Sequence, residues 1–204
     1  MQKFKNGEKA VMTFSLSSIN KLIILITLLM ILLVQVSCGE DANRAAFGSV
    51  GRTMEIHSEK PQVVDKAFFV NEEGETKILV PGASNRQLVV VEVTVVNRTS
   101  TVIPFVVDEE GVQLGDRRAK RYGAVNPREK SKLYEGNLEE SKNVMNIAPI
   151  FWGETDLPRQ RQIGGSIVFD IPKGTILGTL FWDDVEYVPV DYIDYYKGMD
   201  VKNK

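Results

Sequence analysis

The segment that most constrains the fold is a run of β-branched residues at Leu88–Val96, which reads LVVVEVTVV. Branching at Cβ costs rotamer freedom in a helix and suits the pleated surface of a sheet. Alternate side chains of a strand point to opposite faces. One face of this segment therefore carries only valines, namely Val89, Val91, Val93 and Val95. We expect that face to pack against a hydrophobic core.

Shorter strand patterns, separated by turn residues, occupy most of the chain after residue 52. The predicted strands are 53–58, 63–70, 77–80, 102–107, 112–114, 165–171, 176–182 and 185–190. Pro104 cannot donate a hydrogen bond, which predicts an edge or bulged position for 102–107. Between residues 117 and 146 the pattern weakens, and we expect a long loop with a short helix near 137–145. Many short strands without a long amphipathic helix predict an all-β, antiparallel β-sandwich.

Two segments carry a resemblance to a known family. Residues 89–114 read VVVEVTVVNRTSTVIPFVVDEEGVQL, and residues 164–174 read GGSIVFDIPKG. The first segment has an Asn at the end of a strand and then an acid-Gly hairpin. The second is a late strand with the pattern Gly-apolar-Phe-apolar-Pro. The chain thus resembles the immunoglobulin-like domain of unknown function common in bacterial lipoproteins, which is related to a secreted mycobacterial immunogenic antigen. The resemblance implies an immunoglobulin-like sandwich over residues 52–192 and supplies no shared catalytic motif.

The N-terminal segment has the pattern of an export signal. Four lysines and one acid within residues 1–21 precede an apolar run at Leu22–Val34 that only Thr27 interrupts. A membrane-spanning helix needs roughly 20 apolar residues, so this run predicts a cleaved signal more readily than a permanent span. A second methionine, Met12, opens a more ordinary signal, which leaves the true start open between Met1 and Met12.

The single cysteine, Cys38, follows the apolar run directly, within Gln35-Val36-Ser37-Cys38. A small residue before a lone cysteine resembles the lipobox of bacterial lipoproteins, although Gln35 replaces the aliphatic residue that this family prefers. The resemblance implies that Cys38 is lipidated and becomes the mature N-terminus. Residues 39–51, GEDANRAAFGSVG, are small and polar, as expected of a flexible tether. Retention of the apolar run as an uncleaved anchor remains the alternative.

These readings divide the chain into four parts. They are a lipoprotein-type signal peptide at 1–37, a lipidated Cys38 and tether at 38–51, the immunoglobulin-like sandwich at 52–192 and a polar tail at 193–204. Removing the signal takes away four lysines and one glutamate, which leaves a chain more acidic than the net −2 of the whole. An acidic exported domain is poorly suited to nucleic acid. We therefore expect an anchored protein on the extracytoplasmic face of a bacterial cell membrane, with no nucleic-acid partner.

Catalytic and metal-binding patterns are weak. The one histidine, His57, has no partner cysteine, and the serines lie in no G-x-S-x-G motif. We expect no enzymatic activity and no cofactor. Acids at Asp183, Asp184 and Glu186 offer oxygen ligands to calcium, but they form no recognisable calcium loop. Calcium binding in this region is left open, and no metal site is assigned.

Two groups of residues are the candidates for contact with a ligand. One is the basic group Arg117, Arg118 and Arg121, which suits an acidic polymer or lipid headgroups. The other is the tail group Tyr192, Tyr195 and Tyr196, which would be exposed if the tail does not fold back as a strand. These tyrosines belong to a wider aromatic set, most of which we expect in the sandwich core, that could include a stacking surface for carbohydrate or a peptide anchor. Its other members are Phe151, Trp152, Phe181, Trp182 and Tyr187.

The sequence therefore predicts a lipid-anchored binding or interaction module whose partner is an unknown protein or envelope polymer. The alternative is a structural envelope component that self-associates or acts as a spacer.

Overall fold

The computed structural model describes residues 47–136 and 143–192. More than half of these residues lie in strands, and the helix among them is α2 (Pro127–Lys130), which has four residues. The predicted signal peptide, Cys38, the tail at 193–204 and most of the predicted helix at 137–145 lie outside the described residues. No helix within the described ranges is long and apolar enough to cross a membrane.

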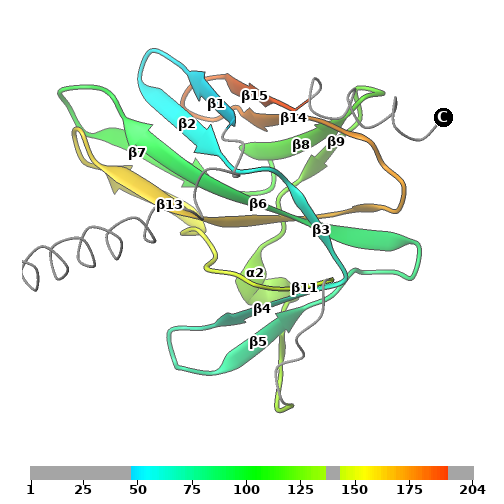
Figure 1. Cartoon of the computed structure of the whole chain (residues 1–204). Coiled ribbons are helices and arrows are strands. Elements are labelled where there is room, and N and C mark those ends of the chain that lie inside the picture. The colour runs from blue at the N-terminus through cyan, green and yellow to red at the C-terminus, as the bar shows by residue number, and fades with distance from the viewer. Residues whose placement is uncertain (1–46, 137–142, 193–204) are drawn as a thin grey trace, which may run out of the picture. The chain divides into compact units, whose positions relative to one another are not determined.

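The central sheet has five strands and crosses the middle of Figure 1. Its strands are β1 (Phe47–Val50), β2 (Met54–Ser58), β3 (Gln62–Val64), β6 (Arg86–Asn97) and β13 (Gln162–Pro172). The order is β1-β2-β6-β13, and β3 continues beside β6 where β2 ends. All pairs are antiparallel, and the longest runs between β6 and β13, from Arg86↔Pro172 to Val96↔Gln162. The valine-rich segment is thus the middle strand, as its length and composition favour.

Three smaller sheets flank the central one. The upper sheet has the order β15 (Val188–Asp191), β14 (Leu177–Trp182), β8 (Val112–Asp116) and β9 (Arg121–Gly123). The lower sheet has the order β10 (Lys132–Leu133), β5 (Thr76–Leu79), β4 (Lys66–Val70) and β11 (Val144–Asn146). A two-stranded sheet joins β7 (Ile103–Val107) to β12 (Gly153–Leu157). Figure 1 shows the upper and lower sheets on opposite sides of the central one.

The upper face of the central sheet forms the main core. The four predicted core valines of β6 are all buried there, which confirms the expected face. They pack in one cluster with Phe105 of β7 and with Leu114 and Trp182 of the upper sheet. The rings of Phe105 and Trp182 lie 5.4 Å apart between centroids. Two antiparallel layers that share one apolar core make this part of the chain a β-sandwich.

The lower face of the central sheet holds a second core that the sequence pattern did not predict. Leu88 and Val90 of β6 are buried there with Val168 of β13. Ala67 and Phe69 of the lower sheet belong to the same cluster. The first half of β6 is therefore buried on both faces, whereas Glu92 and Thr94 further along are only half-buried. The lower sheet makes a third layer over that half alone.

The predicted tether and the predicted long loop both contain secondary structure that the sequence pattern did not indicate. Phe47–Val50, expected as the end of a tether, pairs with β2 as strand β1. Val144–Asn146, expected at the end of a helix, pairs in parallel with β4, so the fold is not purely antiparallel. The predicted long loop also contains helix α2. Asn126 caps this helix by accepting a hydrogen bond from the Arg128 N–H at 3.0 Å, and Pro127 occupies its first turn, where no donor is needed.

The strand with Pro104 is an edge strand, as predicted, since among the described strands β7 pairs with β12 alone. Its sheet is tied to the central one by Asn97, a buried polar residue at the end of β6. The Asn97 amide donates to the carbonyls of Thr101 at 2.8 Å and Leu157 at 2.9 Å. Its oxygen accepts from the Thr99 N–H at 2.8 Å. The Asn that contributes to the family resemblance thus fixes the turn between β6 and β7.

Candidate functional site

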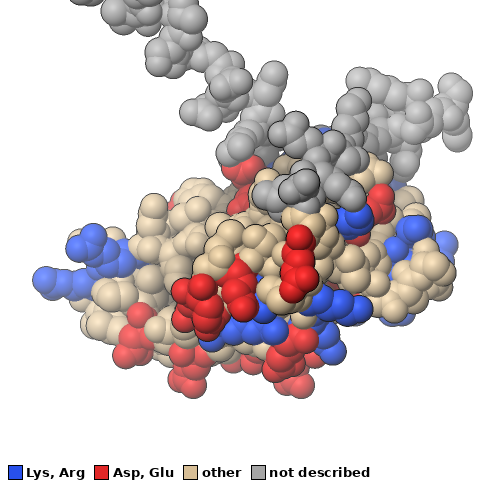
Figure 2. Space-filling view, turned by 90° about the horizontal axis from the view of Figure 1, so that it is seen from below, with Lys and Arg blue, Asp and Glu red and all other residues tan. Residues whose placement is uncertain are grey.

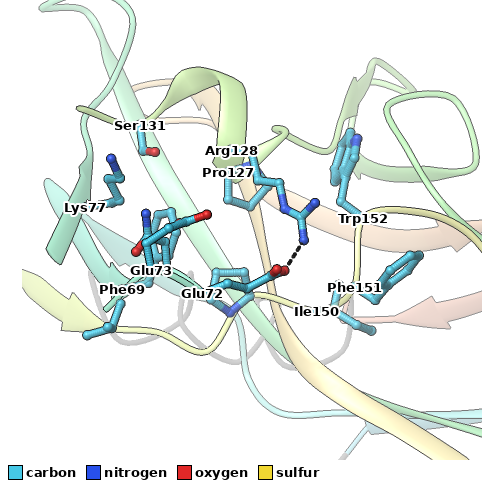
Figure 3. Close-up of a pocket in the computed structure, with 13 residues that line it drawn as sticks. Phe69, Glu72, Glu73, Lys77, Pro127, Arg128, Ser131, Ile150, Phe151 and Trp152 are labelled. Carbon is cyan, nitrogen blue, oxygen red and sulfur yellow. Dashed lines mark hydrogen bonds and ion pairs between the residues drawn. The ribbon is translucent and has the colours of Figure 1, made fainter. Parts of the chain in front are cut away.

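A cleft of about 370 Å³ opens beside the lower sheet (Figure 3). That volume lies within the range of ligand sites on proteins. One side is apolar and aromatic, and the other carries acids and bases. The lining residues come from β4, the β4–β5 turn, β5, α2 with its C-cap and the segment before β12: Phe69, Val70, Asn71, Glu72, Glu73, Lys77, Pro127, Arg128, Ser131, Pro149, Ile150, Phe151 and Trp152.

The aromatic side of the cleft is held by a short segment fastened to β13. The Ser166 N–H donates to the Ala148 carbonyl at 2.7 Å, and the Ile150 N–H donates to the Ser166 carbonyl at 3.1 Å. A Cβ on Gly165 would lie 2.7 Å from the Ala148 oxygen, so only glycine permits this approach. Ile150 is buried as a result, while Phe151 beyond it remains 42% exposed.

The polar side of the cleft is built by α2 and the β4–β5 turn. Arg128, on the first turn of α2, donates to the Glu72 carboxylate across the cleft, as Figure 3 shows. Lys77 lies 2.8 Å from Glu75 at the other end of the turn. The hydrogen bond from Lys77, followed by that from Asn71, holds the pKa of Glu75 below its usual value. The Glu72–Arg128 pair is exposed and Lys77 is half-buried, so these surface pairs orient side chains more than they stabilise the fold.

The cleft also lies beside an open edge of β4. Pairing between β11 and β4 ends at Asn146↔Phe68, and the Ile147 N–H makes a last bond to the Phe68 carbonyl at 2.7 Å. Val70 pairs with Thr76 of β5 on one side. No described strand pairs with Val70 on the other side, and its side chain is 64% exposed. The unpaired backbone N–H and C=O groups of an open strand edge can pair with an added strand.

The charge around the cleft is mixed. Figure 2, seen from below, shows acidic and basic side chains interspersed on this face, with no wide area of one sign. Among residues 47–136 and 143–192, no three His, Cys, Asp or Glu side chains form a group suited to a metal ion. An aromatic wall, an ion pair and an open strand edge provide the means for recognition of a chain segment.

One predicted ligand contact, Tyr192, is wrong. Its side chain is fully buried, and its hydroxyl hydrogen-bonds with that of Ser58 at 2.6 Å. The ring also packs edge-on against Phe47, with centroids 4.9 Å apart. Tyr192 is buried because the unpredicted strand β1 brings Phe47 over its ring. Tyr195 and Tyr196 lie outside the described residues.

The three predicted basic residues do not form one site. Arg117 and Arg118 lie in the β8–β9 turn, at one end of the upper sheet. Arg121 lies on β9 with its guanidinium 3.9 Å from the centre of the Phe181 ring and 3.7 Å from the Asp183 carboxylate. The pleat of β9 turns Arg121 toward β14 rather than toward the turn.

Glu186, one of the three acids considered for calcium, is already engaged. The Glu186 carboxylate accepts hydrogen bonds from the N–H of Thr53 at 2.8 Å and its hydroxyl at 2.6 Å. It also accepts from the N–H groups of Arg52 and Met54. Partial desolvation raises the pKa of Glu186, but these hydrogen bonds outweigh it and lower the pKa to about 2. Glu186 thus fastens the β1–β2 turn to the β14–β15 turn.

His57 is exposed on β2, where its Nε2 lies 3.0 Å from the Glu55 carboxylate. This pairing is local to one strand. His57 lies on the central sheet and is not part of the cleft.

The sequence identified only part of this cleft. Phe151 and Trp152 were noted among the aromatic residues, but Val70, Glu72 and Arg128 were not. The adjacent aromatic pair before a strand was the available signal. The position of the aromatic wall depends on the parallel pairing between β4 and β11 and on the bonds to β13, which no local pattern reveals.

No known family model and no curated protein matches the sequence. Among solved structures, the chain is similar to an uncharacterized β-sandwich protein from Clostridium difficile 630. The sequence identity is 8%, the TM-score is 0.41, and the match covers 69% of this chain and 87% of that chain.

Proposed function

We propose that this chain is a lipid-anchored, extracytoplasmic, immunoglobulin-like module that binds an extended segment of a protein partner. The segment would add to the open edge of β4 and place a side chain against Phe151 and Trp152. The observation that carries this proposal is the coincidence of an unpaired strand edge at Val70 with the aromatic cleft. Main-chain hydrogen bonds give affinity in this binding mode, and the pocket beside the strand gives specificity.

The chemistry of the cleft favours a peptide over a polyanion. A phosphate-rich polymer needs a surface of positive charge, whereas the Glu72–Arg128 pair leaves the cleft with both signs. Exposed aromatic residues are also enriched at protein interfaces. The same edge could in principle be covered by a second copy of this chain, which corresponds to the structural role considered above.

A photo-crosslinking experiment distinguishes these occupants. The full chain carries a benzophenone amino acid in place of Phe151 and is irradiated in its native cells. We expect an adduct between this chain and one other protein, and we expect an added Val70→Pro change to abolish it because the pyrrolidine ring obstructs strand addition. Tyr187, which is 52% exposed in the β14–β15 turn, is the matched control position.

The outcomes separate cleanly. A defined heterologous adduct at position 151 that is absent at position 187 supports peptide binding. An adduct of twice the chain mass favours self-association, and a polydisperse adduct that a polymer-degrading enzyme shortens favours an envelope polymer. Equal adducts at both positions would show that the cleft has no special role.

The membrane anchor rests on the sequence around Cys38. Several acyl chains on one residue hold a protein stably at a membrane, whereas a single chain binds marginally. We expect Cys38→Ser to release the exported protein from the membrane fraction while the domain stays folded, as judged by circular dichroism. Ser37→Ala is the control, and it should remain membrane-bound. A Cys38→Ser protein that stays in the membrane would instead identify residues 22–36 as a retained anchor.

A further inference from the structure

A basic surface lies at the end of the sandwich where the chain enters from the proposed anchor. It surrounds a hollow of about 540 Å³ between the β8–β9 and β13–β14 turns. We call the exposed basic residues Arg118, Lys120 and Lys173 the basic rim, and Arg117 lines the same hollow. Ile176 lies among them and is 43% exposed. Basic side chains around an exposed aliphatic residue suit a lipid surface.

The two turns are joined and held in shape. The Arg117 N–H donates to the Ile176 carbonyl at 3.2 Å, which links one turn to the other. The Asp116 carboxylate accepts from the N–H groups of Arg118 at 2.8 Å and Lys120 at 2.9 Å. Asp116 is the acid within this hollow, and its bonds hold the backbone of the turn on which Arg118 and Lys120 are exposed. A second acid, Asp191, lies at the end of β15, two strands from β8.

The start of the domain lies at this same end. The Phe47 ring packs on Tyr192. The Tyr192 N–H donates to the Gly178 carbonyl at 2.8 Å. Gly178 in turn lies against Asp116, since a Cβ on Gly178 would be 3.3 Å from the Asp116 carbonyl carbon. Cys38 precedes Phe47 by nine residues, which span at most about 30 Å when fully extended. A lipid on Cys38 therefore keeps this end within reach of the membrane.

We propose that the basic rim rests on anionic phospholipid headgroups of the membrane to which the chain is anchored. The proposal rests on the proposed anchor, because the tether brings the rim to the surface. Each basic residue near an anionic surface adds to the attraction, and the tether already holds the rim close to that surface. The contact would orient the domain so that the same end always faces the bilayer.

The test places an environment-sensitive NBD dye at Ile176→Cys in the full chain, extracted from membranes and reconstituted into vesicles. One set of vesicles is phosphatidylcholine, and the other contains phosphatidylglycerol as well. We expect a blue shift of NBD emission on the anionic vesicles alone, with loss of the shift in high salt, where the screening length falls to about 3 Å. A dye at Asp184→Cys, in the β14–β15 turn, should not respond.

Charge reversal completes the design. Arg118→Glu, Lys120→Glu and Lys173→Glu together should abolish the shift. The matched control, Arg159→Glu, Arg161→Glu and Lys130→Glu, changes net charge equally at exposed sites elsewhere and should retain it. An equal loss in both variants, or no difference between the two lipids, would overturn the proposal. A response to inorganic polyphosphate without one to anionic vesicles would also overturn it.

Failure of the anchor is visible separately. Lipidation blocks the Cys38 sulfur, so one dye per chain is expected, and two dyes show an unmodified Cys38. In that case the measurement is repeated on the protein that also carries Cys38→Ser. Flotation of that protein with anionic vesicles and not with neutral ones still supports the basic rim, whereas flotation with neither overturns it.

Discussion

The two faces of the central sheet are buried to very different extents. The core on the upper face contains most of the largest buried side chains of the described domain, among them Trp182, Tyr192, Phe105 and Phe169. The lower face packs a smaller cluster, and it leaves Val70 and Phe151 exposed next to it. Burial of apolar area is the main source of stability. The comparison indicates that the upper face holds the fold, while the lower layer can keep an open edge for binding.

The shortness of the lower sheet explains the difference. Strand β11 has three residues, and it stops pairing with β4 before β4 itself ends. Residues 148–150 then leave toward β13 through their bonds to Ser166. An edge of this kind is an aggregation hazard that proteins usually cover or blunt, which is consistent with a recognition role for it.

The largest expected effect is a core truncation on the upper face. Trp182→Ala should lower the free energy of unfolding by about 4 kcal/mol, and Phe69→Ala in the lower cluster by about 2 kcal/mol, because a thin layer collapses more easily around a cavity. Denaturant unfolding measures both values.

Trp182→Phe sharpens this result, since the indole Nε1 is buried without a hydrogen-bond partner in the described residues. An unpaired buried donor is costly in itself. Its removal should limit the loss of stability to about 1 kcal/mol, despite the smaller ring. Equal costs for the two alanine variants would contradict the division between the faces.

A smaller effect concerns pH. Glu186 has a folded pKa of about 2, below the ordinary value of 4.5, so its charge stabilises the fold fully above about pH 4.5. That contribution is lost as the pH falls toward 2. After allowance for solvent screening, we expect it to amount to about 1–2 kcal/mol.

The measurement compares the protein with Glu186→Gln, so that all other titrating groups cancel. The difference in unfolding free energy should be largest at pH 7 and shrink steadily between pH 4.5 and 2. A difference that is independent of pH would show that Glu186 acts only through its shape. Loss of this contact affects the β1–β2 turn on the upper side and should leave the cleft unchanged.

The smallest expected effect on stability is at the cleft. Phe151→Ala should change the free energy of unfolding by no more than about 0.5 kcal/mol, as is usual for exposed residues. It should also reduce the yield of partner adduct formed by a photo-crosslinking amino acid at position 70. Tyr187→Ala should have a similarly small effect on stability and none on binding. A large loss of stability in Phe151→Ala would mean that the aromatic side chain serves the fold.

Local pattern predicted much of the framework. The period of the β-branched run identified β6 and its core face, and the edge position of β7 followed from the missing donor of Pro104. The sequence did not predict β1, because FGSV lies in a small, polar segment with little strand propensity. It forms a strand because β2 offers a pairing edge and because the Phe47 ring covers Tyr192.

The sequence by itself determined that this chain forms strands, which residues of β6 face the main core, and that its first forty residues have the pattern of an export and anchoring segment. Only the tertiary structure decided that Tyr192 is buried, that Arg121 separates from Arg117 and Arg118, and that Phe151 meets an open edge of β4. The reason is physical. Side-chain alternation is a local property of the backbone, whereas strand pairing depends on contacts between residues far apart in the chain.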